Sequence, residues 1–445
     1  MIAKAQNTPL DKVRVLQRKL YLAAKTNPKR KFGVLYDKVC REDVLRAAYA
    51  QVRANRGAPG VDQQSFETIE KGVGVDSFLS ELRQRLISKR YKPQPVRRVF
   101  IPKADGTQRP LGIPVITDRV VQAAVKIVIE PLFEAIFKGF SYGFRPRKNA
   151  HQALREVYKW LNFKCHYVVD ADLKSYFDTI PHDKLLLSVK TRVTDRSVIK
   201  LIAMWLKAGV MEEMSVRTET AGTPQGGVVS PLLANLYLHW LDQTWEKKGF
   251  GKRVHDAHLV RFADDFVILC KERPEFYLEQ AKLVLDRLGL TLNAKKTRIL
   301  NAREEMFDFL GHRFAVQPSK VTGELKTYYY PSPKAMKSVK KKIREVVRTR
   351  QHWDLPVLVK EKINPLLRGW GNYFKTGNSR KHFQSIANYT TWTLCIMLRK
   401  KQKKRSKGWK DHPPSWFYDY QGLFKLHSLS VVGDAQKRYG RPMPS

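Results

Sequence analysis

The stretch His258-Leu-Val-Arg-Phe-Ala-Asp-Asp-Phe-Val-Ile-Leu-Cys270 decides how the rest of this sequence is interpreted. Two adjacent aspartates lie between two apolar runs, a pattern that predicts a β-hairpin with the acids at its turn. Burying carboxylates among β-branched residues is costly unless a favourable interaction offsets the lost hydration. A divalent cation supplies such an interaction, so Asp264 and Asp265 are candidate metal ligands. An isolated Asp-Asp pair, however, is more often a solvated surface turn.

A second acidic stretch, Tyr167-Val-Val-Asp-Ala-Asp-Leu-Lys-Ser-Tyr-Phe-Asp178, favours the metal-binding interpretation. Alternate side chains of a strand share a face, so Asp170 and Asp172 would project together, with Asp172 near the strand's end. Three carboxylates from two adjacent strand ends can hold two Mg²⁺ ions about 3.5–4 Å apart. Oxygen ligands suit a hard cation such as Mg²⁺, with Mn²⁺ as an alternative. Asp172, Asp264 and Asp265 are therefore the predicted catalytic, metal-binding residues.

Charge is the outlying feature of the composition. The 445 residues include 83 Lys+Arg against 41 Asp+Glu, a formal net charge of +42 that favours a polyanionic partner. Residues 331–445 alone hold 26 Lys+Arg and 6 Asp+Glu, so broad contact with phosphates is expected there. The four cysteines include no C-x-x-C pair, which fits a reduced, cytoplasmic protein of a bacterial-type cytosol, where it could associate with the nucleoid. Charges and a proline interrupt the longest apolar stretch, Val120 to Phe137, so no membrane span is expected.

Apolar spacing and turn residues predict strands separated by helices over residues 60–315, and a basic helical module after Pro331. The expected elements are a strand pair at 98–113 around Asp105-Gly106, a helix at 117–137, strands at 166–173 and 258–270, and helices at 355–374 and 380–404. Ser332-Pro333 is a typical helix start, with a capping serine before a proline at the first helical position.

With these residues in view, the chain resembles group II intron-encoded proteins, which combine reverse transcriptase and maturase activity. Phe262-Ala-Asp-Asp265 looks like the aromatic-x-Asp-Asp box of reverse transcriptases, with phenylalanine where tyrosine is usual. This change keeps the ring, so activity is expected to survive. The other blocks, which run from about residue 40 to about residue 400, are Arg109-Pro-Leu-Gly-Ile-Pro114, Ser141-Tyr-Gly-Phe-Arg-Pro146, Thr223-Pro-Gln-Gly-Gly-Val-Val-Ser-Pro231, Leu292-Asn-Ala-Lys-Lys-Thr297, Phe309-Leu-Gly-His312 and Leu366-Leu-Arg-Gly-Trp-Gly-Asn-Tyr-Phe374.

The resemblance implies an α+β fold of the right-hand polymerase type, with a helical thumb/maturase module. Residues 41–315 would form the reverse transcriptase fingers and palm, and residues 330–404 the thumb/maturase module (domain X). A basic helical segment at 1–40 precedes them. A short basic tail at 405–445 follows and is a candidate reduced DNA-binding segment. That tail contains no cysteine, so an H-N-H endonuclease module is not expected.

The resemblance also assigns roles to individual residues. The backbone of Leu173 would add a metal ligand to the carboxylates of Asp172, Asp264 and Asp265. The implied nucleotide-binding residues are Lys103, Arg109, Phe177, Gln225 and Lys296. Of these, Phe177 would clash with a ribose 2′-hydroxyl, and Lys296 would protonate pyrophosphate. Phe309, Leu310 and Gly311 match the turn that grips the primer. The expected RNA contacts of the helical module are Lys340, Lys341, Arg344 and Arg368, whereas Trp370 and Phe374 also fit a helix–helix core.

The expected activity is RNA-templated addition of deoxynucleotides to a primer 3′-hydroxyl, together with maturase assistance to group II intron splicing and mobility. The expected partners are group II intron RNA, an RNA template with a DNA or RNA primer, and a DNA target. One alternative is a splicing factor without polymerase activity, which the three intact aspartates oppose. Another is a domesticated reverse transcriptase in defence or repair, which the intact Leu366-Leu-Arg-Gly-Trp370 box opposes.

Overall fold

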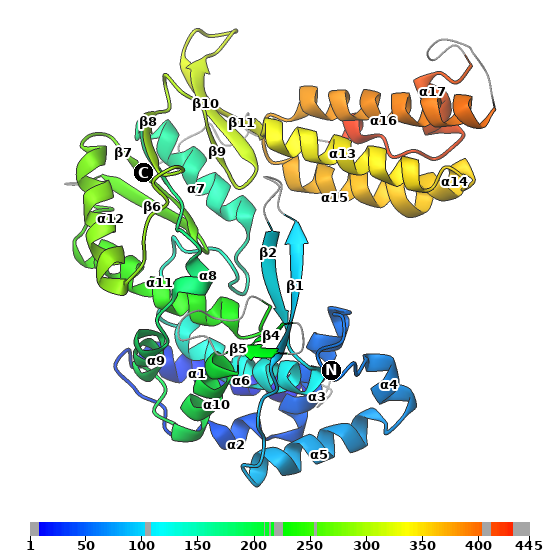
Figure 1. Cartoon of the computed structure of the whole chain (residues 1–445). Helices are drawn as coiled ribbons and strands as arrows, with labels where there is room; N and C mark the ends of the chain where they lie inside the picture. The colour runs from blue at the N-terminus through cyan, green and yellow to red at the C-terminus, as the bar shows by residue number, and fades with distance from the viewer. Residues whose placement is uncertain are drawn as a thin grey trace, which may run out of the picture. The chain divides into compact units, whose positions relative to one another are not determined.

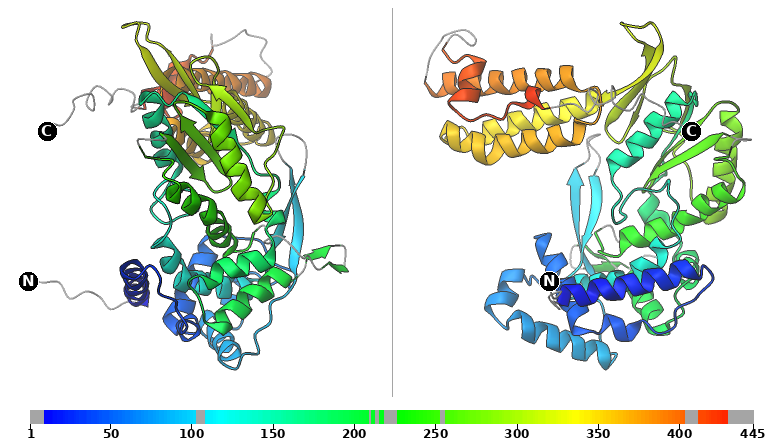
Figure 2. Two further views of the ribbon diagram at one scale, coloured as in Figure 1. Left: turned by 90° about the vertical axis from the view of Figure 1, so that its left-hand side faces the viewer. Right: turned by 180° about the vertical axis from the view of Figure 1, so that it is seen from behind.

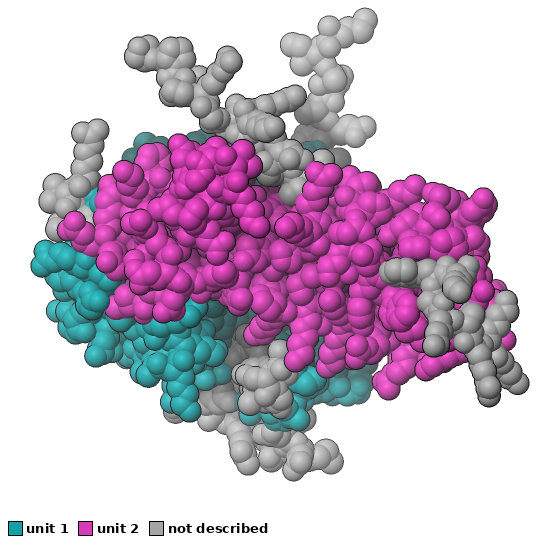
Figure 3. Space-filling model, turned by 90° about the horizontal axis from the view of Figure 1, so that it is seen from above, with its two compact units in different colours: residues 1–149, 171–268, 273–298 teal, residues 150–170, 269–272, 299–445 magenta. Residues whose placement is uncertain are grey.

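The computed structural model describes residues 9–102, 108–208, 210–212, 215–217, 226–252, 256–402 and 411–429. The chain divides into two compact units, drawn in teal and magenta in Figure 3. Unit 1 comprises residues 1–149, 171–268 and 273–298, and unit 2 comprises residues 150–170, 269–272 and 299–445. Among the described residues, no helix combines the length and the apolar character needed to cross a bilayer.

Helices dominate the first part of unit 1 (Figures 1 and 2). Helix α6, Ile116–Glu134, is buried along most of its length, although polar side chains recur every four residues from Asp118 to Glu134. It packs against α1, Pro9–Thr26, and α3, Glu42–Ala54. The expected helix at 117–137 is thus confirmed. The smaller helices of this part are α2, Tyr36–Val39, α4, Phe66–Lys71, and α5, Val75–Ile87.

A four-stranded sheet with the order β2-β1-β4-β5 follows these helices. Strands β1, Val96–Pro102, and β2, Gln108–Ile113, are antiparallel, with Arg98 opposite Gly112 and Ile101 opposite Arg109. The expected strand pair is confirmed, while its turn at Asp105-Gly106 lies outside the described residues. The short strands β4, Val210–Glu212, and β5, Ser215–Arg217, complete the sheet.

A second four-stranded sheet, with the order β6-β7-β3-β8, carries the predicted acids. Its strands are β3, Tyr167–Ala171, β6, Ala257–Phe262, β7, Asp265–Cys270, and β8, Arg298–Asn301. Both expected strand regions are confirmed, and the one at 258–270 forms the two strands of the predicted hairpin. The further helices of unit 1 are α8, Tyr176–Thr179, α9, His182–Lys190, α10, Arg196–Lys207, α11, Ser230–Lys247, and α12, Pro274–Leu288.

Unit 2 combines helix α7, Ala150–Asn162, with a three-stranded sheet and a helical module. The sheet has the order β11-β10-β9, formed by β9, Phe307–Phe309, β10, His312–Pro318, and β11, Leu325–Pro331. The helices are α13, Pro333–Thr349, α14, Leu355–Leu358, α15, Asn364–Phe374, α16, Arg380–Lys401, and α17, Pro414–Asp419, with a π-helical turn at Val359–Ile363 and a 3₁₀ turn at Leu426–Ser428.

Helix α13 begins as its sequence predicts. The Ser332 hydroxyl accepts a hydrogen bond of 3.2 Å from the Ala335 backbone N–H, which satisfies one of the free donors of the first turn. Val339, Ile343 and Val347 are buried on one face, so the apolar spacing found in the sequence is the face that meets the core of the module.

The end of the described chain belongs to the same core. Phe417 and Leu426 are fully buried against the helices of the module. A Cβ atom at Gly371 would lie 2.6 Å from a methyl carbon of Leu426, so glycine is what lets this segment approach α15. Residues 411–429 therefore contribute to the stability of the helical module.

Candidate active site

The predicted acidic pair lies at the turn between β6 and β7. Asp264 and Asp265 follow Ala263, whose φ of 58° is in the left-handed region that residues other than glycine seldom adopt. Such a backbone persists only when the surroundings hold it. The Ala263 carbonyl accepts a hydrogen bond of 2.9 Å from the Arg261 guanidinium, which fixes the turn directly before the two acids.

Arg261 is the centre of a buried polar cluster behind this turn. Its side chain is fully buried and donates to both oxygens of Asp242, at 2.9 and 2.5 Å, and to the Asn235 side-chain oxygen at 3.1 Å. The Asn235 amide in turn donates to the Gly143 carbonyl at 2.6 Å. We call Arg261, Asp242 and Asn235 the turn brace. It connects helix α11 to the backbone that carries the acids.

The charge of Asp242 depends on Arg261. Burial alone would raise the pKa of this carboxyl, but the Arg261 charge and hydrogen bonds from its neighbours outweigh burial and hold the pKa below its ordinary value. Asp242 is therefore ionised and fully paired. Our sequence analysis did not identify the brace. An arginine in the middle of the apolar run 257–262 was the available signal, because a buried charge requires a partner.

The block Ser141–Pro146 supports the same turn. Ser141 forms a bridge with Arg261 next to β6, and the Tyr142 N–H donates to the Arg261 carbonyl at 2.8 Å. A Cβ atom at Gly143 would lie 2.3 Å from the Ala263 backbone nitrogen, so only glycine fits there without movement. The glycine of this block is explained by its contact with the acidic turn.

Asp172 is the first residue after β3, as the sequence predicts. Its Oδ2 accepts a hydrogen bond of 3.1 Å from the Asn293 amide and lies 3.1 Å from the Lys296 ammonium. The Asn293 N–H also donates to the Asp172 carbonyl at 2.8 Å. The block Leu292–Thr297 thus positions Asp172 through Asn293 and Lys296. Asn293 was not among the site residues predicted from the sequence.

Strand order brings the acids to one edge of the sheet. Strand β3 neighbours β7, and the Cys270 thiol at the end of β7 lies 3.8 Å from the Tyr167 carbonyl at the start of β3. The two strands are therefore antiparallel, and the start of β7, Asp265, faces the end of β3, next to Asp172. Among the described residues, these carboxylates do not form a cluster with all ligand oxygens within 4.8 Å, and one oxygen of Asp172 is paired with the Lys296 ammonium.

Leu173, whose backbone carbonyl the resemblance implies as a further ligand, lies in a short bridge. It bridges Leu292, but the hydrogen bonds of that bridge run from the Lys174 N–H to the Thr291 carbonyl and from the Asn293 N–H to the Asp172 carbonyl. The Leu173 carbonyl therefore points away from this ladder. Together with the carboxylates it makes an all-oxygen donor set, which fits a hard divalent cation.

Only some of the predicted nucleotide-binding side chains lie in the described part of the chain. Phe177 lies in α8, is 9% exposed and packs beside the Tyr176 ring at 5.4 Å. Arg109 belongs to β2, and its side chain is outside the described part of the chain, as are Lys103 and Gln225. Next to Gln225, Gly226 has a φ of 117°, and a Cβ atom there would lie 2.2 Å from the Gly112 carbonyl oxygen. The glycine-rich block therefore lies against β2, the strand that contains Arg109.

In unit 2, Phe309, Leu310 and Gly311 form a tight turn between β9 and β10. Phe309 pairs with His312, and Leu310 and Gly311 have φ values of 48° and 75°, the signature of a type I′ hairpin. The Leu310 carbonyl accepts hydrogen bonds from the Tyr373 hydroxyl at 2.9 Å and the His312 ring at 3.2 Å. Burial lowers the pKa of His312 to about 4, so this histidine is neutral.

The predicted RNA-contact residues of unit 2 lie on exposed helix surface. Lys341 and Arg344 are exposed on α13, Lys340 is partly buried with its ammonium 5.4 Å from the Tyr389 ring, and Arg368 is exposed on α15. The rings of Trp370 and Phe374 are 4.8 Å apart and pack into the helical core. Those two aromatic residues thus have the packing role that their spacing of four suggested.

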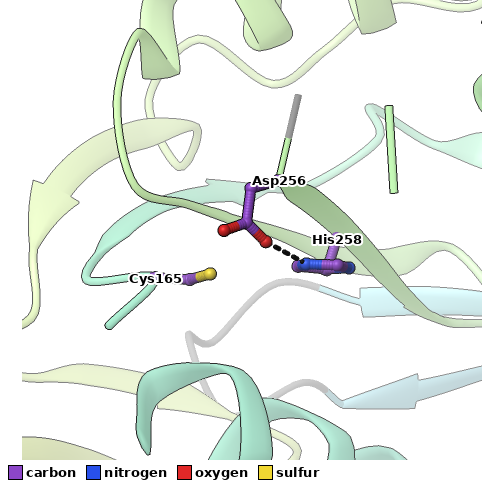
Figure 4. A group of neighbouring side chains, drawn as sticks. All are labelled: Cys165, Asp256 and His258. Carbon is purple, nitrogen blue, oxygen red and sulfur yellow. Dashed lines mark hydrogen bonds and ion pairs between the residues drawn. The ribbon is translucent and has the colours of Figure 1, made fainter. Parts of the chain in front are cut away.

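A third acidic group in unit 1 has a structural role. Asp256 directly precedes strand β6, and His258 is the second residue of that strand. A hydrogen bond of 2.8 Å joins the His258 Nε2 to the Asp256 carboxylate (Figure 4). Cys165, also drawn there, belongs to the other compact unit. The hydrogen bond between His258 and Asp256 fixes the start of β6 to the residue that precedes it.

Comparison with known protein families matches two regions of the chain. A family model described as reverse transcriptase (RNA-dependent DNA polymerase) matches residues 101–314, which include all three predicted catalytic aspartates. A second, described as group II intron, maturase-specific domain, matches residues 336–413. By its polymerase domain, with mixed helices and sheet, the chain is a reverse transcriptase.

Its relatives agree. Protein YkfC of Escherichia coli (strain K12) is 35% identical over 347 residues, covering 70% of this chain and 90% of YkfC. An uncharacterized 91 kDa protein in the cob intron of Schizosaccharomyces pombe is 30% identical, covering 79% of this chain and 52% of that protein. The group II intron-encoded protein LtrA of Lactococcus lactis subsp. cremoris is 37% identical, covering 48% of this chain and 35% of LtrA. The chain thus spans about half or less of these two intron-encoded relatives.

The chain belongs to the group II intron-encoded reverse transcriptase and maturase family. Its two domains carry the corresponding roles, RNA-directed DNA polymerase and splicing maturase.

Proposed function

We propose that Asp172, Asp264 and Asp265 hold two Mg²⁺ ions and that the chain uses them to add deoxynucleotides to a primer 3′-hydroxyl on an RNA template. The observation that carries this proposal is the strand-end geometry, in which Asp172 directly follows β3 and the start of β7 lies beside the end of β3. The Leu173 carbonyl completes an oxygen donor set. When bound, the ions would activate the primer hydroxyl and stabilise charge on the departing pyrophosphate. Mn²⁺ would substitute, because it accepts the same ligands.

Lys296 and Asn293 prepare Asp172 for this task. The Asn293 amide holds one carboxylate oxygen, and the Lys296 ammonium, 3.1 Å away and mostly exposed, balances the negative charge of the site. On nucleotide binding, Lys296 would come within reach of the triphosphate and donate its proton to pyrophosphate. We expect Lys296→Met to slow incorporation and to alter its dependence on pH, whereas Lys295→Met, which removes an exposed neighbouring ammonium, should leave both unchanged.

The remaining predicted residues complete the polymerase. Lys103 and Arg109 would clamp the triphosphate, Gln225 would lie near the nucleotide sugar, and the Phe177 ring would exclude a 2′-hydroxyl. The turn Phe309–Gly311 would grip the primer end. Its type I′ geometry and its hydrogen bonds with Tyr373 and His312 make the turn rigid. The module formed by residues 330–404 would act as the thumb of a right-hand polymerase whose fingers and palm are residues 41–315.

The maturase role is assigned to the basic face of that module. Lys340, Lys341, Arg344 and Arg368 would contact group II intron RNA through its phosphates and shape. The same protein would then bind the intron RNA for splicing and use its polymerase site for mobility. For mobility the protein would also bind a DNA target, and residues 405–445 are the candidate segment for that contact.

Primer extension tests the polymerase proposal. Wild type, Asp264→Asn/Asp265→Asn and the control Asp286→Asn, exposed on α12, are compared on an RNA template with a DNA primer, deoxynucleotides and Mg²⁺. We expect the double variant to lose roughly 10³-fold or more of the rate, because transition-state charge is stabilised at these acids. Mn²⁺ binding followed by electron paramagnetic resonance reports lost metal binding, and the circular dichroism of the same samples reports lost folding. Equal extension by all three proteins would refute the assignment.

A splicing assay with the same proteins tests the second role. The polymerase variant should still promote splicing of its intron RNA, whereas Lys340→Glu/Lys341→Glu/Arg344→Glu should not. If wild type promotes splicing but extends no primer, the splicing-factor alternative replaces the polymerase proposal.

A further inference from the structure

A cavity of about 500 Å³ lies in unit 1, formed by the start of α2, the segment after α5 and one face of α10. Its lining residues are Tyr36, Lys89, Tyr91, Lys92, Pro93, Ser197, Lys200, Leu201, Ala203, Met204 and Lys207. We call it the lysine groove. Helix α10 contributes residues spaced by three and four, such as Ser197, Lys200, Met204 and Lys207, which share one helix face.

The rim of the groove is cationic. Lys89, Lys92, Lys200 and Lys207 are all exposed, and within the described part of the chain none of them forms an ion pair. No acidic side chain is among the described residues that line the groove. Lys207 and Lys89 lie at helix C-termini, where a cation is favourable in any protein. That explanation does not extend to Lys92, which is in a loop, or to Lys200, in the middle of α10.

The wall of the groove is aromatic and rigid. The Tyr91 hydroxyl donates to Asp118 at 2.7 Å and accepts from the Trp205 indole at 2.9 Å, and the Tyr36 hydroxyl donates to the Leu86 carbonyl at 2.8 Å. Both hydroxyls are thus satisfied by the protein, and the two rings are fixed before any ligand arrives. Tyr91 is buried and supports the wall from behind, whereas Tyr36, Pro93 and Met204 are partly exposed and offer apolar surface beneath the lysines.

Rigid rings beneath unpaired cations are what a single nucleic-acid strand requires, since its bases stack on apolar surface and its phosphates need positive charge. We infer that the lysine groove binds a single-stranded segment of RNA, with the phosphates at Lys92, Lys200 and Lys207 and a base against the partly exposed ring of Tyr36. The choice of RNA over DNA rests on the proposed function, in which intron RNA is the partner.

The lysine groove is separate from the catalytic acids. Helices α2 and α10 lie well apart from strands β6 and β7 in Figure 1, within the same unit. A strand in the groove is therefore not the part of the template that meets Asp172, Asp264 and Asp265. It would anchor a distant part of the bound RNA while the polymerase site is engaged.

The test uses the full chain with Lys200→Glu/Lys207→Glu and the control Lys12→Glu/Lys19→Glu. The control reverses two exposed lysines, also seven residues apart, on α1. The probe is a fluorescent oligouridylate that contains 4-thiouridine, titrated at several salt concentrations and then photo-crosslinked. We expect the groove variant to bind more weakly, with a salt slope of log K smaller by about 1.4, and the control to keep the wild-type slope. Wild-type crosslinks should map to peptides that contain Tyr36, Tyr91 or Met204.

Two further arms keep this inference distinct from the proposed function. Extension of a short template–primer duplex should be unchanged in the groove variant, because its residues are not in the polymerase site. An oligodeoxythymidylate of equal length, with 4-thiothymidine at the matching position, should crosslink to the groove less than the RNA probe does. Equal slopes in both charge-reversed variants, wild-type crosslinks that avoid the groove, or stronger crosslinking of the DNA probe would each overturn the inference, whether or not the chain extends primers.

Discussion

Replacing Arg261 with methionine is expected to damage both the stability of unit 1 and the geometry of the acidic turn. Arg261 and Asp242 are both fully buried, so the variant leaves the Asp242 carboxylate in the interior without its main partner. Breaking a buried pair in this way costs about 3–5 kcal/mol. Asp242→Leu should cost a similar amount for the opposite reason, because it leaves the arginine unpaired.

The double variant Arg261→Met/Asp242→Leu separates stability from function. It leaves no buried charge, so most of the lost free energy of unfolding should return, in keeping with the near-neutral effect of replacing whole buried pairs with apolar residues. Primer extension should remain impaired, because Asn235 and the Ala263 carbonyl still lack the guanidinium that holds the turn.

Urea unfolding followed by tryptophan fluorescence measures the first effect, and single-nucleotide primer extension measures the second. Arg313→Met is the control, because the Arg313–Asp308 pair is partly exposed and should contribute no more than about 1 kcal/mol. A double variant with wild-type stability and wild-type extension would show that the brace does not position the turn.

Three further predictions follow from single residues. Phe177→Ala should relax the preference for deoxynucleotides, measured as the ratio of deoxy- to ribonucleotide incorporation; an unchanged ratio would remove the gate assignment. Gly143→Ala should reduce extension, because its Cβ would lie 2.3 Å from the Ala263 nitrogen, whereas Gly139→Ala, with no neighbour within 4 Å, should not. The folded-state pKa of His312, about 4, is below the unfolded value of about 6.5. Stability is therefore fully present above pH 6.5 and falls by about 3 kcal/mol towards pH 4. His312→Phe should flatten that part of the pH–stability curve, and an equally steep curve would refute it.

Local patterns in the sequence determined much of the site. The apolar runs on both sides of Asp264-Asp265 predicted two strands with acids at their turn, because side-chain alternation and turn position are properties of a few consecutive residues. The same is true of the strand that ends at Asp172, the strand pair 98–113 and the start of α13 at Ser332. In each case the signal and the structure lie within the same short segment.

The tertiary structure alone decided which distant groups hold the acids. Asn293 is 121 residues from its partner Asp172, and Arg261 is 19 residues from its partner Asp242. Asn235 connects Arg261 to the backbone carbonyl of Gly143. Spacing cannot encode these pairings, because they follow from strand order and from the packing of α11 behind the turn. The sequence thus determined which residues bear the charge. The tertiary structure decided which partners fix it, since buried polar groups must find hydrogen bonds wherever the folded chain brings a partner within reach.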